Sequence, residues 1–287
     1  MEKLLQAMLG FYVPLALGWL YGRRSKEALA GSKVIAQLLV YLFLPALIFT
    51  SLYGKSVGEG LAVPIVASTS VALGALMARL LLKKPEYVLT CMYPNSGYLP
   101  IPLAFSLWGK EGVAYVALYV LGNNPTANAL APLLAGRGLR EGVRRMLLFP
   151  PLHAVALAIL LNVTHVIVPA PVLSTVARLG LVAPPLALVL LGMKFAESRV
   201  ELSSSARVYS VRLGLVMPLA FSLAMLCGLG DLPLKVVLLE LLMPPAVSNV
   251  ALASELGMDS ARVASIVVTL TLLSTLIVVP AFLLYAA

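Results

Sequence analysis

Charged side chains are scarce in this sequence, and that scarcity excludes most soluble folds. Only 11% of the 287 residues are Asp, Glu, Lys or Arg, whereas 61% are hydrophobic and the mean hydropathy is +0.99. A soluble domain carries about 25% charged residues. We therefore expect an integral membrane protein with almost no soluble part.

Residues that often carry catalysis are few as well. The two aspartates, Asp231 and Asp259, are expected in loops, which argues against an intramembrane aspartyl protease and against Asp-rich prenyl-diphosphate sites. The two histidines are far apart and do not form a His-x-x-x-His zinc pair. We expect no enzyme activity, no metal site and no cofactor.

Cysteine occurs only twice, as Cys91 and Cys227. The topology described below puts Cys91 toward the inner end of one span and Cys227 toward the outer end of another. Their Cα atoms would then lie far beyond the ~7 Å limit for a disulfide. We interpret both as buried apolar thiols.

Long apolar runs fill the rest of the chain, and each is long enough to cross a bilayer as a helix. The ten expected spans are residues 3–22, 32–53, 60–82, 87–109, 112–134, 146–168, 172–193, 206–228, 234–256 and 261–285. The first run is followed directly by further spans and has no usual cleavage site, so we interpret it as a retained helix. We expect an all-α membrane protein with a single transmembrane domain, residues 1–287.

The net charge of +9 orients this protein and does not indicate nucleic-acid binding. With the N-terminus outside, sixteen basic residues fall on inward loops and helix ends and four on outward ones, a strong positive-inside bias. The inward set is Arg23, Arg24, Lys26, Lys33, Arg79, Lys83, Lys84, Arg137, Arg140, Arg144, Arg145, Lys194, Arg199, Arg207, Arg212 and Arg262. We expect a multi-pass protein of the cell (plasma) membrane with both termini extracellular.

Two of the ten spans are interrupted by helix-breaking residues. The span 87–109 contains Pro94, Gly97, Pro100 and Pro102, and the span 234–256 contains Pro244 and Pro245. A proline inside a helix costs ~3 kcal/mol or more. Paired broken spans in two halves of a membrane chain indicate a transporter binding site. We predict two inverted five-helix repeats, 1–136 and 137–287, whose broken fourth and ninth helices cross near the midplane.

Asparagine gathers around these breaks. Asn95 and Asn249 lie beside them, Asn123, Asn124 and Asn128 lie in the fifth span, and only Asn162 falls at a loop. An asparagine in hydrocarbon is costly without a partner. Each break also leaves a half-helix N-terminus with about +0.5 charge, and two opposed N-termini form an anion site.

Three stretches resemble the auxin efflux carrier family, the prokaryotic relatives of plant PIN transporters within the bile acid/sodium symporter-like superfamily. These stretches are LVYLFLPALIFTSL, YPNSGYLPIPLAFSLWGKEGVAYVALYVLGNN and MPPAVSNVALASELGMDSARVASIVVTLTLLSTL. The resemblance covers the whole chain. It implies ten helices in two inverted repeats, small organic-anion substrates such as indole-3-acetate or dicarboxylates, elevator-like movement and a homodimer.

The expected substrate-binding residues are Asn95, Ser96, Ser248, Asn249, Asn124 and Asn128. In the bacterial pattern of the family an asparagine often follows Pro-x-Ala-Val, and here Ser248 takes that place with Asn249 next. One position is a rotation of about 100° on a helix, so either residue is a candidate. The alternative for these side chains is a structural one, as helix caps or as hydrogen-bonding partners between helices.

Two further residues are candidates for H⁺ or Na⁺ coupling. Glu240 lies one turn before Pro244, and an intramembrane carboxylate is a functional candidate by default. His153 follows two prolines in the sixth span; it is either a proton relay or a packed histidine. The leading hypothesis is a secondary carrier for organic anions. A sodium-coupled symporter, an intramembrane enzyme, and a channel or receptor-like protein remain the alternatives.

Overall fold

The computed structural model describes residues 2–55, 58–136, 138–195 and 200–286. Its helices are α1 Glu2–Arg24, α2 Lys26–Leu38, η1 Leu39–Phe43, α3 Leu44–Leu52, η2 Gly58–Gly60, α4 Val63–Leu81, α5 Pro85–Met92, α6 Pro100–Leu134, α7 Leu139–Leu147, α8 Pro150–Val163, α9 Ala170–Gly180, α10 Ala183–Phe195, α11 Leu202–Val211, η3 Arg212–Val216, α12 Met217–Leu226, α13 Asp231–Leu242, α14 Ser248–Glu255, α15 Ser260–Leu273, η4 Ser274–Val278 and α16 Val279–Ala286. The described chain is all helical apart from one isolated bridge.

Among the described residues, six helical segments are long and apolar enough to cross a membrane. They are Leu5–Arg24, Gly31–Leu52, Val63–Leu81, Ala170–Phe195, Leu202–Leu226 and Ser260–Ala286. Helix α8 is a shorter apolar helix, and the broken segments contain the short helices α5, α13 and α14. The chain is therefore a multi-pass membrane protein, and the ten-span arrangement in two inverted repeats stays a prediction.

Three of the long segments contain a wide, π-helical turn. These turns are η1, η3 and η4, and a proline follows each of them at the second position after the turn: Pro45, Pro218 and Pro280. Proline has no N–H and leaves a carbonyl of the preceding turn without its usual donor. A π-helical turn shifts the hydrogen bonding by one residue and keeps the helix continuous.

Both breaks expected from the prolines are present. Helix α5 ends at Met92 and α6 begins at Pro100, while α13 ends at Leu242 and α14 begins at Ser248. Helix α6 is itself two helices joined at a kink at Gly109, whose φ of 60° is a left-handed conformation that glycine adopts without strain.

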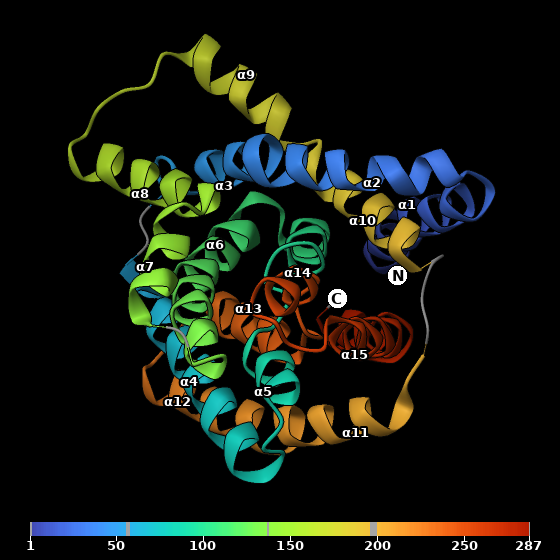
Figure 1. Ribbon diagram of the computed structural model, residues 1–287. Helices are drawn as coiled ribbons and strands as arrows, with labels where there is room; N and C mark the ends of the chain where they lie inside the picture. The colour runs from blue at the N-terminus through green and yellow to red at the C-terminus, as the bar shows by residue number, and fades with distance from the viewer. Residues whose placement is uncertain (1, 56–57, 137, 196–199, 287) are drawn as a thin grey trace.

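The helices form two groups on either side of the crossing segments. In Figure 1, α1, α2, α3 and α10 lie along one side, and α4, α5, α11 and α12 lie along the other, with α6, α13 and α14 between them. Helices α1 and α10 pack closely because glycines face the partner backbone. A Cβ atom on Gly192 would lie 2.0 Å from the carbonyl oxygen of Leu15.

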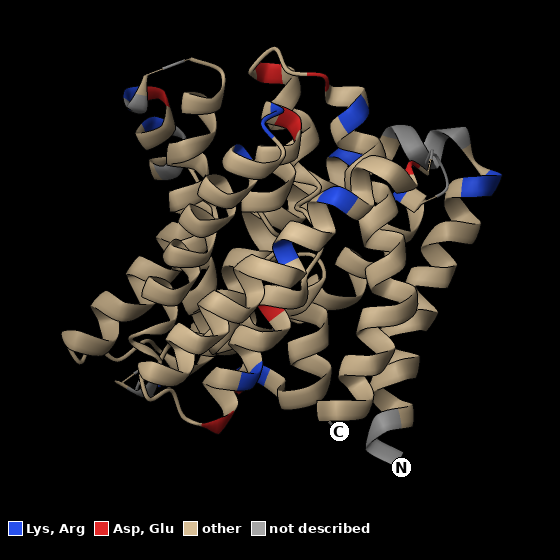
Figure 2. Cartoon of the chain, turned by 90° about the horizontal axis from the view of Figure 1, so that it is seen from below, with Lys and Arg blue, Asp and Glu red and all other residues tan. Residues whose placement is uncertain are grey.

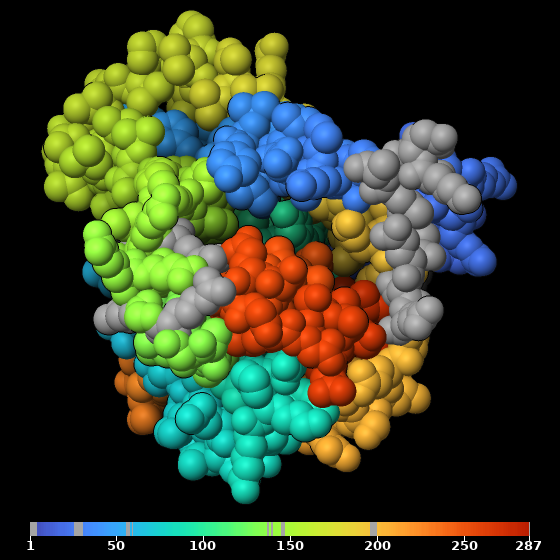
Figure 3. Space-filling view, viewed as in Figure 1, coloured from blue at the N-terminus to red at the C-terminus, as the bar shows by residue number. Residues whose placement is uncertain are grey.

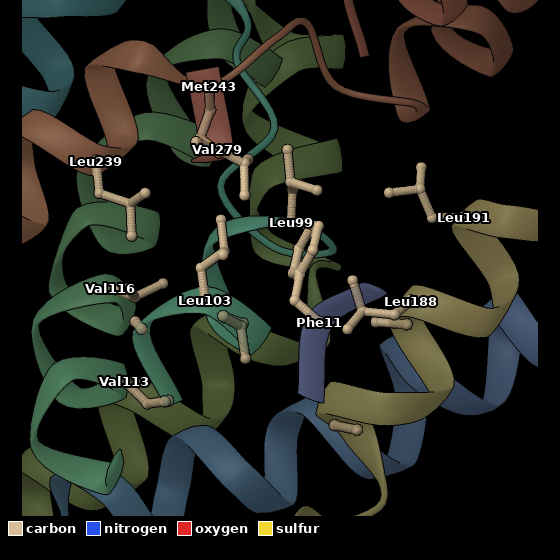
Figure 4. Close-up of a cluster of buried hydrophobic side chains, with 14 of the residues drawn as sticks. Phe11, Leu99, Leu103, Val113, Val116, Leu188, Leu191, Leu239, Met243 and Val279 are labelled. Atoms are coloured by element: carbon tan, nitrogen blue, oxygen red, sulfur yellow. The ribbon is translucent and has the colours of Figure 1, made fainter. Parts of the chain in front are cut away.

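A buried apolar cluster joins the first group to the central helices. Figure 4 shows Phe11 of α1, Leu188 of α10, Leu103 of α6, Leu239 of α13 and Val279 of α16 pointing toward one another. All five side chains are at most 1% exposed. Lipid tails are as apolar as these side chains, so the cluster stabilises the bundle through van der Waals packing and not through transfer from water.

The two chain ends lie at the same end of the molecule. In Figure 2 the termini are at the bottom, whereas most Lys and Arg residues gather at the top. This separation agrees with the charge bias in the sequence, although the orientation in the membrane stays a prediction.

The basic segment after the fifth span is helical, because residues 139–147 form α7, and a Cβ atom on Gly142 would lie 2.7 Å from Cα of Ala129 in α6. One local prediction was wrong. Cys227 is exposed and not buried, because it is the C-cap residue of α12, whereas Cys91 is buried as expected.

Candidate functional site

The two broken segments pair with each other where they cross. The backbone N–H of Asn95 donates to the carbonyl of Pro244 at 2.8 Å, and that of Ala246 donates to the carbonyl of Tyr93 at 2.9 Å. These bonds make a short antiparallel bridge between Pro94 and Pro245. The crossing therefore satisfies backbone groups that the prolines exclude from helices, as a membrane interior requires.

Asn95 uses one end of its amide to hold the turn that precedes helix α6. Its Oδ1 accepts hydrogen bonds from the backbone N–H groups of Gly97 at 3.2 Å and Tyr98 at 3.0 Å. Its Nδ2 is buried and has no partner among the described residues. Pro100 and Pro102 lack N–H groups, so the first turn of α6 presents few amides to a ligand.

Asn249 behaves in the complementary way. Its Nδ2 donates to the carbonyl of Tyr93 at 3.0 Å, at the end of α5, and its Oδ1 is buried without a partner among the described residues. Each crossover asparagine thus holds the backbone with one amide atom and leaves the other unpaired. Buried unpaired polar atoms are costly and need an explanation.

The fifth span meets the crossing through a compact amide cluster. Ser96 donates to Oδ1 of Asn124 at 3.0 Å and accepts from Nδ2 of Asn123 at 2.8 Å. All three side chains are buried. Asn123 was not among the expected binding residues, although Asn124 and Asn128 of the same span were.

A second set of contacts joins the fifth span to α14. The amide of Asn128 donates to the hydroxyl of Tyr93 at 3.3 Å and to the carbonyl of Asn124 at 2.8 Å. The Tyr93 hydroxyl also hydrogen-bonds to the side chain of Ser248. The structure therefore brings all six predicted binding residues to the crossing.

A cavity opens beside the crossing, between α10 and α14. Its volume is about 190 Å³, and it is lined by Ala36, Tyr98, Leu190, Leu191, Lys194, Val247, Ser248 and Ala251. A wider vestibule of about 1110 Å³ shares Leu191, Lys194, Val247 and Ala251 with this inner cavity and extends to Asp259 and Arg262. A hollow is visible there between the orange-red atoms of α14 and α15 and the gold atoms of α10 (Figure 3).

Of the six predicted residues, only Ser248 lines the inner cavity. It is exposed, whereas Asn249 is 0% exposed on the other face of the same helix. Lys194 lines both cavities and donates to the hydroxyl of Ser32 at 2.9 Å. In the sequence, Lys194 belongs to the basic residues that orient the chain in the membrane. Its position at the end of an apolar span is the feature that could have marked it as a cavity residue.

Arg212 holds the C-terminal ends of both half-helices, which corrects our placement of it near a helix end facing inward. It is 1% exposed and begins the π-helical turn η3. Its guanidinium donates to the carbonyl oxygens of Met243 at 3.1 Å and Cys91 at 3.0 Å, and to those of Glu240 and Leu241 at 3.5 and 3.3 Å. These carbonyls carry the negative end of the helix dipole, so a cation is stabilised there.

Glu240 is fully buried, and neither of its carboxyl oxygens has a hydrogen-bond partner among the described residues. Lys235 on the same helix binds Asp231 at 2.8 Å and does not pair with Glu240. His153 lies exposed on α8, and its Nε2 is 2.7 Å from the carbonyl of Leu147. Asn162 lies in the last turn of α8 and holds the end of α3, donating to Leu52 and accepting from Gly54.

Clusters of metal-binding side chains are missing from the described residues. These residues contain no group of three or more His, Cys, Asp or Glu side chains that could hold a metal ion. Residues 54–58 match the Gly-x-Ser-x-Gly pattern, with Ser56 outside the described residues. They follow helix α3, whereas a hydrolase nucleophile elbow follows a strand.

Comparison with known proteins identifies a family of membrane transporters. A family model described as membrane transport protein matches residues 4–141 and 139–283. The chain is 26% identical over 261 residues to an uncharacterized transporter of Methanothermobacter thermautotrophicus, covering 85% of each chain. It is 27% identical over 275 residues to an uncharacterized transporter of Methanocaldococcus jannaschii, covering 86% of this chain and 87% of that one.

Proposed function

Because this chain belongs to the membrane transport protein family, that of the auxin efflux carriers and their prokaryotic relatives, we propose that it is a secondary carrier for small organic anions that works by alternating access. The substrate occupies the inner cavity beside the crossing. Its carboxylate lies near the ammonium group of Lys194 and the hydroxyl of Ser248. Asn95 and Asn249 stay candidates for contact through their unpaired amide atoms.

The composition of the inner cavity is the observation that carries this proposal. It combines one cation and two hydroxyl groups, from Ser248 and Tyr98, with walls of Leu190, Leu191, Val247 and Ala251. At about 190 Å³ it is smaller than the roughly 300–1,000 Å³ of drug-sized sites. A small monoanion with an apolar or aromatic body fits this lining better than a dicarboxylate, which would need a second cation.

The position of the cavity supports movement of elevator type. One wall comes from α2 and α10, and the other comes from the crossing and α14. A binding site at the boundary between two helix groups changes its access when one group slides along the other. The proposal includes a homodimer, and lipid covers the exposed apolar side chains.

Arg212 favours this carrier over the sodium-coupled symporter. In carriers with broken helices, half-helix C-terminal carbonyls are places where Na⁺ binds. Here the carbonyls of Cys91 and Met243 already accept hydrogen bonds from the guanidinium. Because the guanidinium of Arg212 already occupies these carbonyls, they are not free to bind Na⁺.

The test is counterflow in liposomes that contain the purified protein. Labelled indole-3-acetate and labelled succinate are compared, each with Na⁺ and with K⁺ as the only metal cation. We expect saturable exchange of the aromatic acid that does not depend on Na⁺. Flux that does not saturate would indicate a channel, chemical conversion would indicate an enzyme, and exchange of neither acid would overturn the proposal.

A further inference from the structure

Glu240 is the buried ionisable group that the proposed anion route does not use. It lies in the last turn of α13, its side chain is 0% exposed, and both carboxyl oxygens lack a hydrogen-bond partner among the described residues. An ionised carboxylate in such a place is strongly disfavoured. No hydrogen bond from a described residue compensates a charge on this carboxyl group.

The elements packed against α13 present two groups that act on Glu240. Helix α6 presents the hydroxyl of Tyr119, which lies 3.0 Å from that of Ser70 on α4, and η3 presents the guanidinium of Arg212. Helix α12 has no titratable side chain, and the one such residue in α4, Arg79, is in its last turn. Arg212 therefore supplies the charge that Glu240 faces.

Arg212 acts on Glu240 without bonding to its carboxyl group. The guanidinium hydrogen bonds go to backbone carbonyls, including the carbonyl of Glu240 itself at 3.5 Å. Burial favours the neutral carboxyl form, whereas the nearby positive charge favours the ionised one. Burial and the charge of Arg212 thus favour opposite protonation states of Glu240.

A metal ion is a poor neutralising group here. The fixed guanidinium repels a second cation, and a hard cation needs several oxygen ligands. The hydroxyl groups of Ser70 and Tyr119 are within hydrogen-bond distance of each other. A proton needs no ligand shell, so the same environment accepts it.

We propose that Glu240 is a proton-binding site that couples proton movement to anion movement in the same direction. The inference rests on the carrier function proposed above. With Glu240 ionised, its charge offsets that of Arg212 at the crossing. When a proton from solvent forms an O–H bond with the carboxyl group, the charge of Arg212 is no longer offset, and the crossing binds an anion more tightly. By reciprocity, a bound anion increases the affinity for the proton.

The experiment is calorimetric titration of the purified protein with indole-3-acetate in buffers of different ionisation enthalpy, which counts the protons taken up on binding. Wild type is expected to take up protons, and its affinity for the anion increases as the pH falls. Glu240→Gln imitates the protonated carboxyl group. It is expected to bind the anion with an affinity that does not change with pH and without proton uptake.

Two variants control the interpretation. Asp231→Asn makes the same change on the same helix at a side chain that is 81% exposed, and it should behave as wild type. Glu240→Asp keeps a carboxyl group and should retain proton uptake, so a folding defect of Glu240→Gln does not decide the result. Proton uptake by Glu240→Gln equal to that of wild type, or anion binding by wild type without proton uptake, overturns the inference and leaves the carrier intact. If wild type neither binds nor transports any anion, the carrier proposal fails first.

Discussion

Nη1 of Arg212 donates a hydrogen bond to the carbonyl oxygen of Cys91 at 3.0 Å. Cys91 lies in the last turn of α5, in the first broken span, and Arg212 begins η3 in the second half of the chain. Nε of Arg212 reaches the carbonyl of Met243 at 3.1 Å, just beyond α13. One side chain thus fastens the ends of both half-helices that lead into the crossing.

Removal of this side chain should destabilise the protein. In Arg212→Ala the carbonyls of Cys91 and Met243 lose their charged donor while they remain buried. Hydrogen bonds to a charged group contribute roughly 1.5–3 kcal/mol each, so two of them predict a loss of at least about 3 kcal/mol. Thermal unfolding in detergent measures the effect.

Arg207 on α11 provides the matched control for this variant. Its side chain is exposed, so Arg207→Ala should unfold at the temperature of wild type. Arg212→Lys keeps the charge but not the planar set of donors and should fall between the two. Equal stability of Arg212→Ala and Arg207→Ala would show that the guanidinium does not hold the crossing.

Asn249→Ala and Asn95→Ala should affect both stability and binding, because each amide has two functions. The hydrogen bonding of each amide to the backbone contributes about 1 kcal/mol to folding. The unpaired Nδ2 of Asn95 is a donor that can bind the substrate carboxylate, whereas the unpaired Oδ1 of Asn249 only accepts and can bind an N–H group of the substrate or a bridging water. Loss of such a contact predicts a decrease in affinity of roughly 10- to 150-fold. Affinity and melting temperature are measured on the same purified variants.

Asn162 does not serve as a control for these variants, because it holds the end of α3. Ser210 is suitable, since its exposed hydroxyl bonds only within α11, to the carbonyl of Ala206. Ser210→Ala should match wild type in both measurements. If the Asn95 and Asn249 variants unfold at a lower temperature yet bind the anion as tightly as wild type, these asparagines only stabilise the crossing.

Lys194→Gln should weaken anion binding. The ammonium group lines both the vestibule and the inner cavity, and loss of one charge-assisted contact predicts a decrease of roughly 10-fold or more in affinity. Lys110→Gln changes an exposed lysine of α6 and should have no effect. The proposed carboxylate position is refuted if both glutamine variants bind the anion equally well.

The membrane orientation can be tested with single cysteine probes. The background is Cys227→Ser, because Cys227 is exposed, whereas Cys91 is buried and can stay. An impermeant thiol reagent added outside intact cells should label a cysteine at position 58 and miss one at position 138. Labelling of position 138 alone would reverse the orientation without changing the fold.

The crossing shows how far local sequence determines such a site. Pro94 and Pro245 lack N–H groups and cannot continue a helix, so the breaks were predictable from the residues at those positions alone. Helix α6 begins at Pro100, a residue that is favoured in the first turn of a helix. The fate of Cys227 was not predictable in the same way, because a residue at a helix end is exposed or buried according to its neighbours.

The sequence by itself determined that this chain lies in a membrane, that two spans are broken, and that asparagines and serines gather at the breaks. These properties follow from composition and from the chemistry of single residues. Only the tertiary structure decided that Ser248 faces the cavity while Asn249 holds Tyr93, and that Arg212 is buried against Cys91. Those outcomes depend on helix rotation and on contacts between residues far apart in the chain. An arginine near a helix end has the same local sequence whether its guanidinium reaches water or the carbonyls of another helix.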